Sequence, residues 1–493
     1  MFNLFRNKNN DKESLDKILA KSADYKCIEY FNQKSKVSFT LKFLATLIDE
    51  KTVQESILPY LLEENFKQIE DAKEIIPLAD IHMSEDISQI EEKLFTGSVL
   101  LTVNGKENRF CFLGAKKEIG RNVSLPEVEF SVIGPKESFV ESLDQNLNLI
   151  RKRIPVKELI MEKLTVGTLS KAKVAILYID GIVNPENVNT VRQRIKDIEF
   201  DEITDSSYIV QIISDNQNSP FPQLLDTERP DRISAILAEG KVAIFVDGSP
   251  HALIGPTTLV EFFSSFEDYY LNWILSSFFR LIRLFAVVFS ILVTPVYVAT
   301  LSYHYELIPQ DLLGTLVASR RAIPFPPILE AIFLEVTIEL LREAGARLPT
   351  KVGQTIGIVG GIVIGTASVE AGLTSNILLI FIALAALASF TTPVYRIGNT
   401  IRLLRFPFLL FAELWGLLGI VICFCFLITH LIRLTSLGRP YLEPIYPPRW
   451  TDLKDAFIRL SFDKLRKRPF LVNTKQSARF PRKSAKEKKD IEE

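Results

Sequence analysis

The stretch from Val352 to Val394, VGQTIGIVGGIVIGTASVEAGLTSNILLIFIALAALASFTTPV, decides the fold class because it is almost entirely apolar. Its only charged residue is Glu370. An α-helix rises about 1.5 Å per residue and the core of a bilayer is about 30 Å thick, so about 20 residues span it. The stretch is long enough for two membrane-spanning helices, and the sequence predicts the turn between them at residues 370–376.

Glycines in the first half of this stretch are spaced for close packing of helices. Four recur at every fourth residue and form one slowly drifting stripe on a helix, with a fifth beside them; they are Gly353, Gly357, Gly361, Gly365 and Gly360. In lipid, small residues at this spacing let two helix backbones approach closely. Two interpretations stay open: a packing seam within one chain, or a self-associating helix whose other face lines a pore.

Charge divides the chain into an acidic head, a neutral apolar middle and a basic tail. Residues 1–283 hold 34 Lys and Arg against 43 Asp and Glu, residues 284–432 hold 8 against 8, and residues 433–493 hold 16 against 8. The net charges are therefore −9, 0 and +8, in agreement with −1 for the whole chain. The first 30 residues lack the apolar core of a signal peptide, so we expect the head to stay in the cytosol.

The head alternates between strand and helix patterns, which predicts a cytosolic α/β region in two subdomains. We expect a flexible leader over residues 1–35 and subdomains over residues 36–160 and 161–270. In the first subdomain, alternating segments on both sides of Asn104-Gly105 predict a hairpin with a tight turn.

In the second subdomain, a buried strand that ends at Asp180 precedes a helix with Asn184 as its N-cap and Pro185 at its first position. The run YIVQII at residues 208–213 is predicted to be a strand. A later helix is expected to end at Gly240.

Residues 271–432 are expected to form an α-helical polytopic membrane domain, followed by a basic tail at 433–493. An aromatic amphipathic helix at 257–285 should lead into it. The expected apolar or semi-polar segments are 284–303, 327–342, 353–371, 376–394 and 406–432. The second of them is either a crossing or re-entrant, and the side on which the tail lies stays open. Three prolines predict a sharp start to this second segment, at Pro324, Pro326 and Pro327.

Acidic residues inside these segments are the best functional candidates, because a carboxylate within a membrane needs a partner, water or an ion. They are Glu335, Glu339 and Glu413. Arg342 lies on the same face as the first two and could neutralise them, and Glu413 is close enough to a segment end to reach the interface. The functional interpretation is a ring of acids in an oligomer that attracts cations to a pore mouth.

Catalytic signatures are absent from the sequence: it contains no H-E-x-x-H, G-x-S-x-G or P-loop, and its four histidines are scattered. We therefore expect no enzyme activity, metal site or cofactor. The basic tail has little aromatic interleaving, which favours anionic lipid or another subunit over nucleic acid as its partner.

Four extended strings together resemble the A subunit of the bacterial spore germinant receptors, the GerA family. They are SDNQNSPFPQ (214–223), DTERPDRISAILAEGKVAIFVDGSPHALIGPTT (226–258), PFPPILEAIFLEVTIELLREAGARLPTKVGQTIGIVGG (324–361) and LRFPFLLFAELWGLLG (404–419). The resemblance covers roughly residues 35–468. Polar residues of the first two strings are candidates for an interface: Asp215, Asn216, Gln217, Asn218, Asp247 and Ser249.

This resemblance implies a subunit of the spore inner membrane with its N-terminal region on the cytosolic, or core, side. It implies a transporter-like B subunit, thought to bind the small-molecule germinant, and a lipoprotein C subunit as partners. The A subunit of the family is proposed to oligomerise and pass ions. The alternative is a non-conducting scaffold that assembles the B and C subunits.

Overall fold

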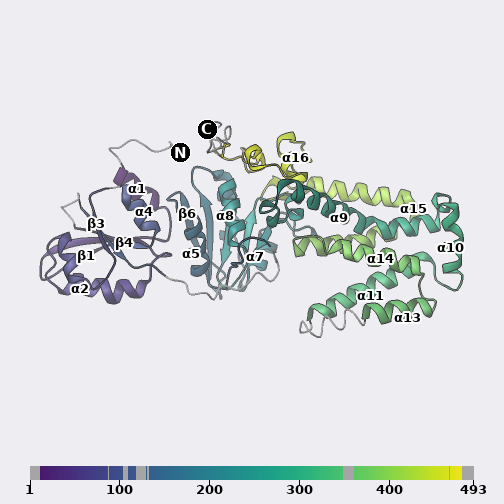
Figure 1. Cartoon of the computed structure of the whole chain (residues 1–493), viewed down its shortest axis with the longest axis horizontal. Helices are drawn as coiled ribbons and strands as arrows, with labels where there is room; N and C mark the ends of the chain where they lie inside the picture. Colours follow the sequence, from purple (N-terminus) through teal and green to yellow (C-terminus); the bar gives the residue numbers. More distant parts are fainter. Residues whose placement is uncertain are drawn as a thin grey trace, which may run out of the picture.

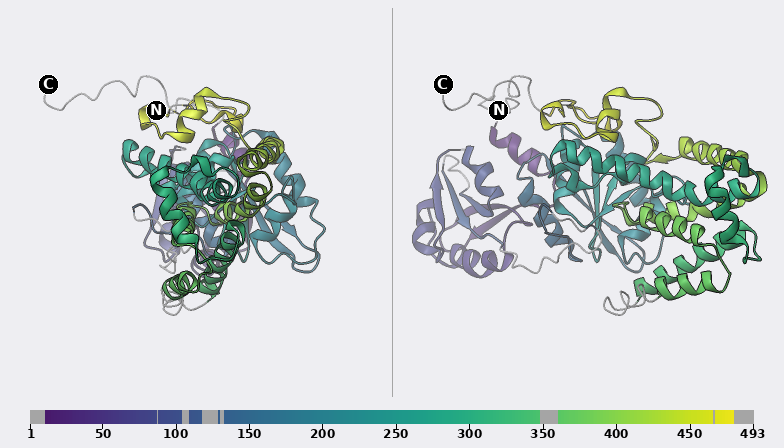
Figure 2. Two further views of the ribbon diagram at one scale, coloured as in Figure 1. Left: turned by 90° about the vertical axis from the view of Figure 1, so that its right-hand side faces the viewer. Right: turned by 45° about the vertical axis from the view of Figure 1, so that its right-hand side comes forward.

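The computed structural model describes residues 11–86, 88–103, 109–117, 129, 133–347, 360–465 and 467–479. Along the longest axis of the molecule, a first sheet with its helices is followed by a second sheet and then by a group of long helices (Figure 1). The tail returns from those helices to lie beside the second sheet (Figure 2). The predicted order of an α/β region before a helical region is confirmed.

The first sheet is antiparallel, with the strand order β1-β2-β4-β5-β3 and an apolar core on each face. Its strands are β1 (Tyr25–Asn32), β2 (Val37–Leu44), β3 (Ile81–Ser84), β4 (Ser98–Val103) and β5 (Phe110–Gly114). The helices around it are α1 (Asp11–Leu19), η1 (Thr52–Ile57), α2 (Leu58–Glu63), η2 (Ile69–Asp71), α3 (Ala72–Ile75) and α4 (Ser88–Phe95). The predicted hairpin is confirmed as β4 and β5, whereas its turn at Asn104-Gly105 lies outside the described residues.

The expectation of a flexible leader over residues 1–35 was wrong for its described part. The strand β1 pairs with β2 along its whole length, from Tyr25 opposite Leu44 to Asn32 opposite Val37. Leu15 and Leu19 of α1 are buried in the core on one face of the sheet. The polar composition of the leader hid these elements, because β1 is an edge strand and most of its side chains are exposed.

The second sheet is also antiparallel, with the strand order β6-β7-β9-β10-β8. Its strands are β6 (Leu159–Val166), β7 (Ala172–Ile179), β8 (Leu225–Thr227), β9 (Val242–Val246) and β10 (Ala252–Gly255). The helices are α5 (Leu143–Arg153), α6 (Pro185–Lys196), α7 (Ser206–Ile213) and α8 (Pro230–Glu239). As predicted, the Asn184 side chain caps α6 by accepting a hydrogen bond from the Glu186 amide, and α8 ends at left-handed Gly240, with φ at 93°.

Residues 208–213 were predicted to form a strand, but they belong to the helix α7. The Asp205 carboxylate caps this helix by accepting a hydrogen bond of 2.8 Å from the Ser207 amide. Its buried apolar residues, Ile209, Val210 and Ile213, fall on one helical face. A short apolar run cannot be assigned to strand or helix by its periodicity alone, and here the cap decided the outcome.

A buried ion pair joins the two sheets. The Arg151 guanidinium, from α5, lies 2.8 Å from the Asp24 carboxylate, and both side chains are at most 1% exposed. Arg151 also donates hydrogen bonds to the Ser22 hydroxyl at 3.1 Å and to the Leu159 carbonyl at 3.0 Å. These contacts fix the first sheet to the second.

The helical region contains α9 (Trp273–Ser302), α10 (Gln310–Arg320), α11 (Pro327–Arg347), η6 (Gly360–Ile364), α13 (Gly365–Glu370), α14 (Asn376–Ser389) and α15 (Tyr395–Arg433). In the described part of the chain, α9 and α15 are the two helices long and apolar enough to cross a membrane. The predicted turn between α13 and α14 is confirmed. The predicted helix at 257–285 is wrong in its first half, where two 3-10 turns (259–263 and 266–269) precede Asn272, which caps α9.

The last apolar segment, expected at 406–432, lies within a helical hairpin. The helix α15 reverses at Gly416, whose backbone angles of φ 60° and ψ −139° are non-helical. A Cβ on Gly419 would overlap the Phe411 carbonyl, so this glycine lets the two halves meet. Ile401 and Leu431, from opposite halves, lie in one core cluster with residues of the second sheet. Both ends of α15 are therefore beside that sheet.

The chain after α15, residues 434–479, which we call the tail fold, packs back on the second sheet. It contains β11 (Thr435–Ser436), β12 (Arg439–Pro440) and α16 (Trp450–Phe457), with 3-10 turns at 462–464 and 470–472. Arg468 donates a hydrogen bond of 2.8 Å to the Ala238 carbonyl at the end of α8.

Candidate functional site

A buried ion pair in the helical region brings four helices together and includes one predicted acid. The Glu335 carboxylate of α11 lies 3.0 Å from the Arg405 guanidinium of α15 and accepts a hydrogen bond of 3.2 Å from the Thr294 hydroxyl of α9. Arg405 also donates to the Ser290 hydroxyl at 2.5 Å and to the Ala385 carbonyl at 2.8 Å. Both charged side chains are 2% exposed, so each depends on the other for compensation.

Two further acids of α11 are paired above and below this site. Glu330, which is fully buried, lies 2.9 Å from Arg320 and accepts a hydrogen bond of 3.1 Å from the Ser375 amide. Glu339 lies 2.5 Å from Arg342 and 3.4 Å from Arg402. The predicted pairing of Arg342 with Glu339 is confirmed, but Glu335 pairs with Arg405 instead. Each acid of this row is therefore neutralised inside its own chain.

The other predicted residues of the helical region lie apart from this row. Glu413 is half-buried near the bend of α15, and the Ser302 hydroxyl donates a hydrogen bond of 3.4 Å to its carboxylate. A Cβ on Gly365 would lie 3.6 Å from the Leu379 side chain of α14. Gly361, in contrast, is exposed with open space beside it. Gly360 begins η6; Gly353 and Gly357 lie outside the described residues.

Three prolines precede α11, and the helix begins at the last of them. Pro324 and Pro326 lie in the irregular segment before the helix, and Pro327 is its first residue. Proline is tolerated at this position because the first amides of a helix have no partner within it. The Pro326 carbonyl then accepts hydrogen bonds from the Leu329 and Glu330 amides, at 3.0 and 3.3 Å.

The candidate interface residues divide between the two ends of α7. Asp215, Asn216, Gln217 and Asn218 follow its C-terminal end, whereas Ser249 binds Asp205 and Ser206 at its N-terminal end. Asp247 accepts a hydrogen bond of 3.1 Å from the Leu143 amide. The structure therefore does not bring these six residues together.

The loop at 214–223 joins the second sheet to the helical hairpin and the tail fold. The Thr400 hydroxyl of α15 donates a hydrogen bond of 2.6 Å to the Pro220 carbonyl, and Ser219 is 2.8 Å from the His430 ring. Asp215 accepts hydrogen bonds from Arg194, from the Thr435 hydroxyl and from the Gly438 amide. The loop is thus an interface within the chain.

Replacement of Asp215 by asparagine is expected to destabilise the protein by about 1–3 kcal/mol at neutral pH, because the charge-assisted hydrogen bonds weaken. Burial alone would raise the pKa of the Asp215 carboxyl, but hydrogen bonds from Thr435, Arg194 and Gly438 outweigh it and lower the pKa. Since the native pKa is below the unfolded value of about 3.9, this stabilisation is complete above that pH and is lost as the pH falls.

Thermal melts of the detergent-solubilised full chain across this pH range would measure the effect. The melting temperatures of wild type and Asp215→Asn should converge in acid. The exposed Asp197, replaced by asparagine, is the matched control and should change little. A constant difference between wild type and Asp215→Asn at all pH values would contradict the assignment.

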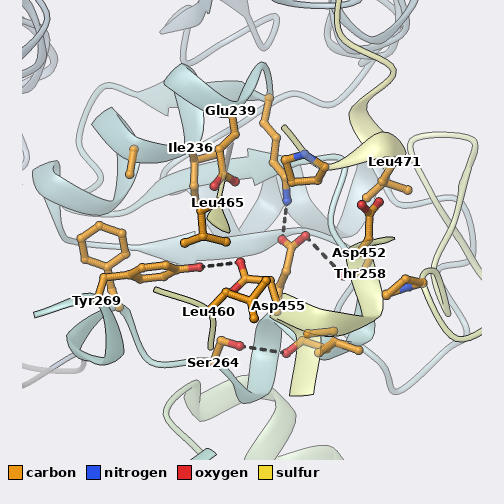
Figure 3. A pocket seen from close by; sticks show the side chains of 18 of the residues that line it. Ile236, Glu239, Thr258, Ser264, Tyr269, Asp452, Asp455, Leu460, Leu465 and Leu471 are labelled. Carbon is orange, nitrogen blue, oxygen red and sulfur yellow. Dashed lines mark hydrogen bonds and ion pairs between the residues drawn. The ribbon is translucent and has the colours of Figure 1, made fainter. Parts of the chain in front are cut away.

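A cavity of ≈ 900 Å³ opens between the second sheet, the 3-10 turns before α9 and the tail fold. Two ion pairs lie in its walls: Lys241 binds Glu261, and Arg479 lies 2.6 Å from Glu239. Figure 3 shows the Tyr269 hydroxyl pointing to the Asp455 carboxylate, at 3.5 Å. Burial raises the pKa of Asp455. Among the residues that the structure describes, no group of His, Cys, Asp and Glu is placed to hold a metal ion.

A family profile described as "Bacillus/Clostridium GerA spore germination protein" matches residues 13–471. The chain belongs to the GerA family of spore germination proteins. The predicted family is therefore confirmed, and this GerA protein is a germinant-receptor A subunit. Three strings of the resemblance carry the features described above: the loop at 214–223, the acids of α11 and the hairpin of α15.

Known relatives align with this GerA protein over most of its length. Spore germination protein GerQA from Bacillus cereus is 50% identical over 468 residues, which cover 95% of this chain and 93% of that protein. Spore germination protein A1 from Bacillus subtilis (strain 168) is 40% identical and covers 86% of this chain and 87% of its own length. The "uncharacterized membrane protein YfkQ" of Bacillus subtilis (strain 168) is 35% identical, with 87% and 84% covered.

Among solved structures, the N-terminal domain of the A subunit of the Bacillus megaterium spore germinant receptor GerK3 is similar to part of this GerA protein. The two are 26% identical with a TM-score of 0.37, and the alignment covers 50% of this chain and 92% of that one. None of the names of these relatives denotes an enzyme.

Two partners of the acidic row were not foreseen from the sequence. Arg405 is 70 residues from Glu335, and Arg320 precedes Glu330 across the proline segment. A signal was present, because an arginine at the border of an apolar segment can supply the partner that a buried acid needs. Counting cations and acids together over residues 284–432, which hold eight of each, would have suggested pairing.

Proposed function

We propose that this GerA protein is a multi-pass subunit of the spore inner membrane that oligomerises to form the ion conduit of a germinant receptor. The observation that carries the proposal is the exposure of a helical pair, α11 and η6–α13. Beyond Glu335, α11 has no buried residue, and its exposed side chains include Val336 and Leu340. In α13 only Gly365 and Ser368 are buried. A surface this apolar needs lipid or further copies of the chain.

The path of the chain supports an even number of crossings. From the second sheet, α9 runs outward and α11 returns; η6–α13 runs outward and α14 returns; and the two halves of α15 complete a third pair (Figure 1). In the proposed topology, the tail fold lies on the same side of the membrane as the sheets. Arg347, Arg396 and Arg433 lie on that side too, in agreement with the positive-inside rule.

In the proposed oligomer, the exposed Gly361 faces a neighbouring copy, whereas the buried Gly365 packs against Leu379 of α14 within the chain. Another face of that helix lines the conduit. Because the acids of α11 are paired internally, they would hold this helix in position and not bind the permeating ions. The transporter-like B subunit and the lipoprotein C subunit are the proposed partners, and the B subunit would bind the germinant.

Conductance of the reconstituted chain tests this function. Gly361→Leu is expected to abolish or lock ion flux through liposomes while the protein still accumulates, since a leucine would separate the packed backbones. Gly314→Leu is the matched control, because Gly314 is exposed on α10 with open space beside it. Unchanged flux in Gly361→Leu would contradict the conduit.

The internal pairing of the acids favours one second candidate, a non-conducting scaffold for the B and C subunits. Glu330, Glu335 and Glu339 all have arginine partners in the same chain, as a structural role would require. A purified receptor complex that assembles normally with this chain yet shows no ion flux under any germinant would support the scaffold and exclude the conduit.

A further inference from the structure

We propose that the first part of α9 and the tail fold together form a lipid-binding collar, which rests on an anionic bilayer surface at the base of the helical region. This inference rests on the proposed membrane function and adds a second kind of membrane contact to it. The collar consists of residues 273–283 of α9 and residues 450–470 of the tail fold. The occupant is the headgroup region of a bilayer rich in anionic lipid.

The length of α9 places its first part outside the bilayer core. Its 30 residues extend about 45 Å, against a core of about 30 Å. The uncharged residues 284–302 fit the core, so residues 273–283 lie at the interface on the side of the second sheet. This part exposes large apolar side chains, which on one side are Ile274, Leu275, Phe278, Phe279 and Ile282; Trp273 is exposed at its first position. Aromatic residues are enriched at such interfaces.

The opposite side of residues 273–283 is polar and is fixed to the tail fold. Arg280 and Arg283 both bind the buried Asp268, and Arg280 also donates to the Asp455 carbonyl in α16. The Ser277 hydroxyl donates a hydrogen bond of 3.2 Å to the Arg459 carbonyl. The tail fold is therefore held beside the start of α9 (Figure 2).

Arg459 completes this attachment from the tail side. Its side chain, 2% exposed, donates to the Leu271 carbonyl and, at 3.2 Å, to the Tyr269 carbonyl, and its guanidinium lies 4.7 Å from the centre of the Phe462 ring. Those carbonyls belong to the segment that leads into α9. These contacts fix the tail fold to the start of α9, in addition to its covalent connection to the end of α15.

The tail fold carries the same combination of side chains as interfacial membrane helices, which pair aromatic and lysine residues. Trp450 is 78% exposed, and Ile458, Phe462 and Phe470 are also exposed. Lysines on the same segment are exposed as well, at Lys464, Lys467 and Lys475. The buried arginines satisfy backbone carbonyls. Lys464 and Lys467 are exposed at the edge of the cavity and can contact lipid phosphates, whereas Lys475 lies near Asp180, at the junction with the first sheet.

The test uses the three tryptophans of the full chain, Trp273, Trp415 and Trp450, reconstituted in vesicles of phosphatidylglycerol and phosphatidylcholine brominated near its carbonyls. A variant that retains only Trp450, with phenylalanine at the other two, reports the collar. A variant that retains only Trp415, at the far bend of α15, reports insertion of the helical region. We expect bromine to quench both.

Charge reversal sharpens the test. Replacing Lys464 and Lys467 by glutamate should reduce quenching of Trp450 at least about twofold and leave Trp415 unchanged. The control reverses two exposed lysines of the first sheet, Lys34 and Lys36, which changes the net charge equally and should leave Trp450 quenched. Quenched Trp415 with unquenched Trp450 would overturn the collar but keep the membrane function. If neither is quenched, both proposals fail.

Discussion

Replacement of Arg405 by methionine is expected to destabilise the helical region by about 3–5 kcal/mol, because it leaves the buried Glu335 carboxylate without its compensating charge. The change would also remove hydrogen bonds to Ser290 and to the Ala385 carbonyl. Since α9, α11, α14 and α15 meet at this guanidinium, we expect the replacement to disturb the packing of all four helices.

The apparent melting temperature of the detergent-solubilised chain, together with its yield from membranes, measures this effect. Arg433→Met is the matched control, because Arg433 is an exposed arginine of the same helix. Adding Glu335→Gln to Arg405→Met should restore part of the loss, since it removes the uncompensated charge. A melting temperature equal to that of wild type in Arg405→Met alone would contradict the role assigned to the pair.

Replacement of Arg151 by methionine should have a comparable effect, about 3–5 kcal/mol, at the junction of the two sheets. The variant would leave the buried Asp24 carboxylate uncompensated and the Leu159 carbonyl without a donor. We expect the first sheet to separate from the second before either unfolds, because their own cores are intact.

Hydrogen exchange of the full chain would locate this loss, with faster exchange at the junction than within β2 or β9. The matched control is Lys163→Met, which breaks the exposed pair between Lys163 and Asp144 and should cost less than about 1 kcal/mol. Unchanged exchange around Ser22 and Leu159 in Arg151→Met would show that the ion pair does not hold the sheets together.

The sequence predicted best where one local signal was decisive. Asn184 and Pro185 start α6, Pro327 starts α11, and Gly240 ends α8, because caps and breakers act within a few residues. Local signals failed where tertiary contacts decide. The strand β1 has a polar pattern, and only pairing with β2 reveals it. The reversal at Gly416 depends on how closely Gly419 approaches Phe411, and a short segment of sequence does not predict that approach.

The candidate site was predictable in kind but not in pairing. Because an isolated charge in an apolar segment is costly in free energy, we could predict that Glu335 and Glu339 need partners. Which arginine serves which acid depends on the rotation and depth of α11 against α15, and the nearer Arg342 was a wrong guess for Glu335. The four strings that resemble the GerA family predicted the family of the chain, but they did not predict these contacts.

The reversal of α15 at Gly416 has a consequence for regulation. If the helices cross the bilayer as proposed, a soluble molecule able to reach the sheets could also reach the tail fold, without any passage through lipid. One factor on that side could then hold the first sheet and the tail fold at once, and any signal arriving from the opposite compartment would have to travel through the helices themselves.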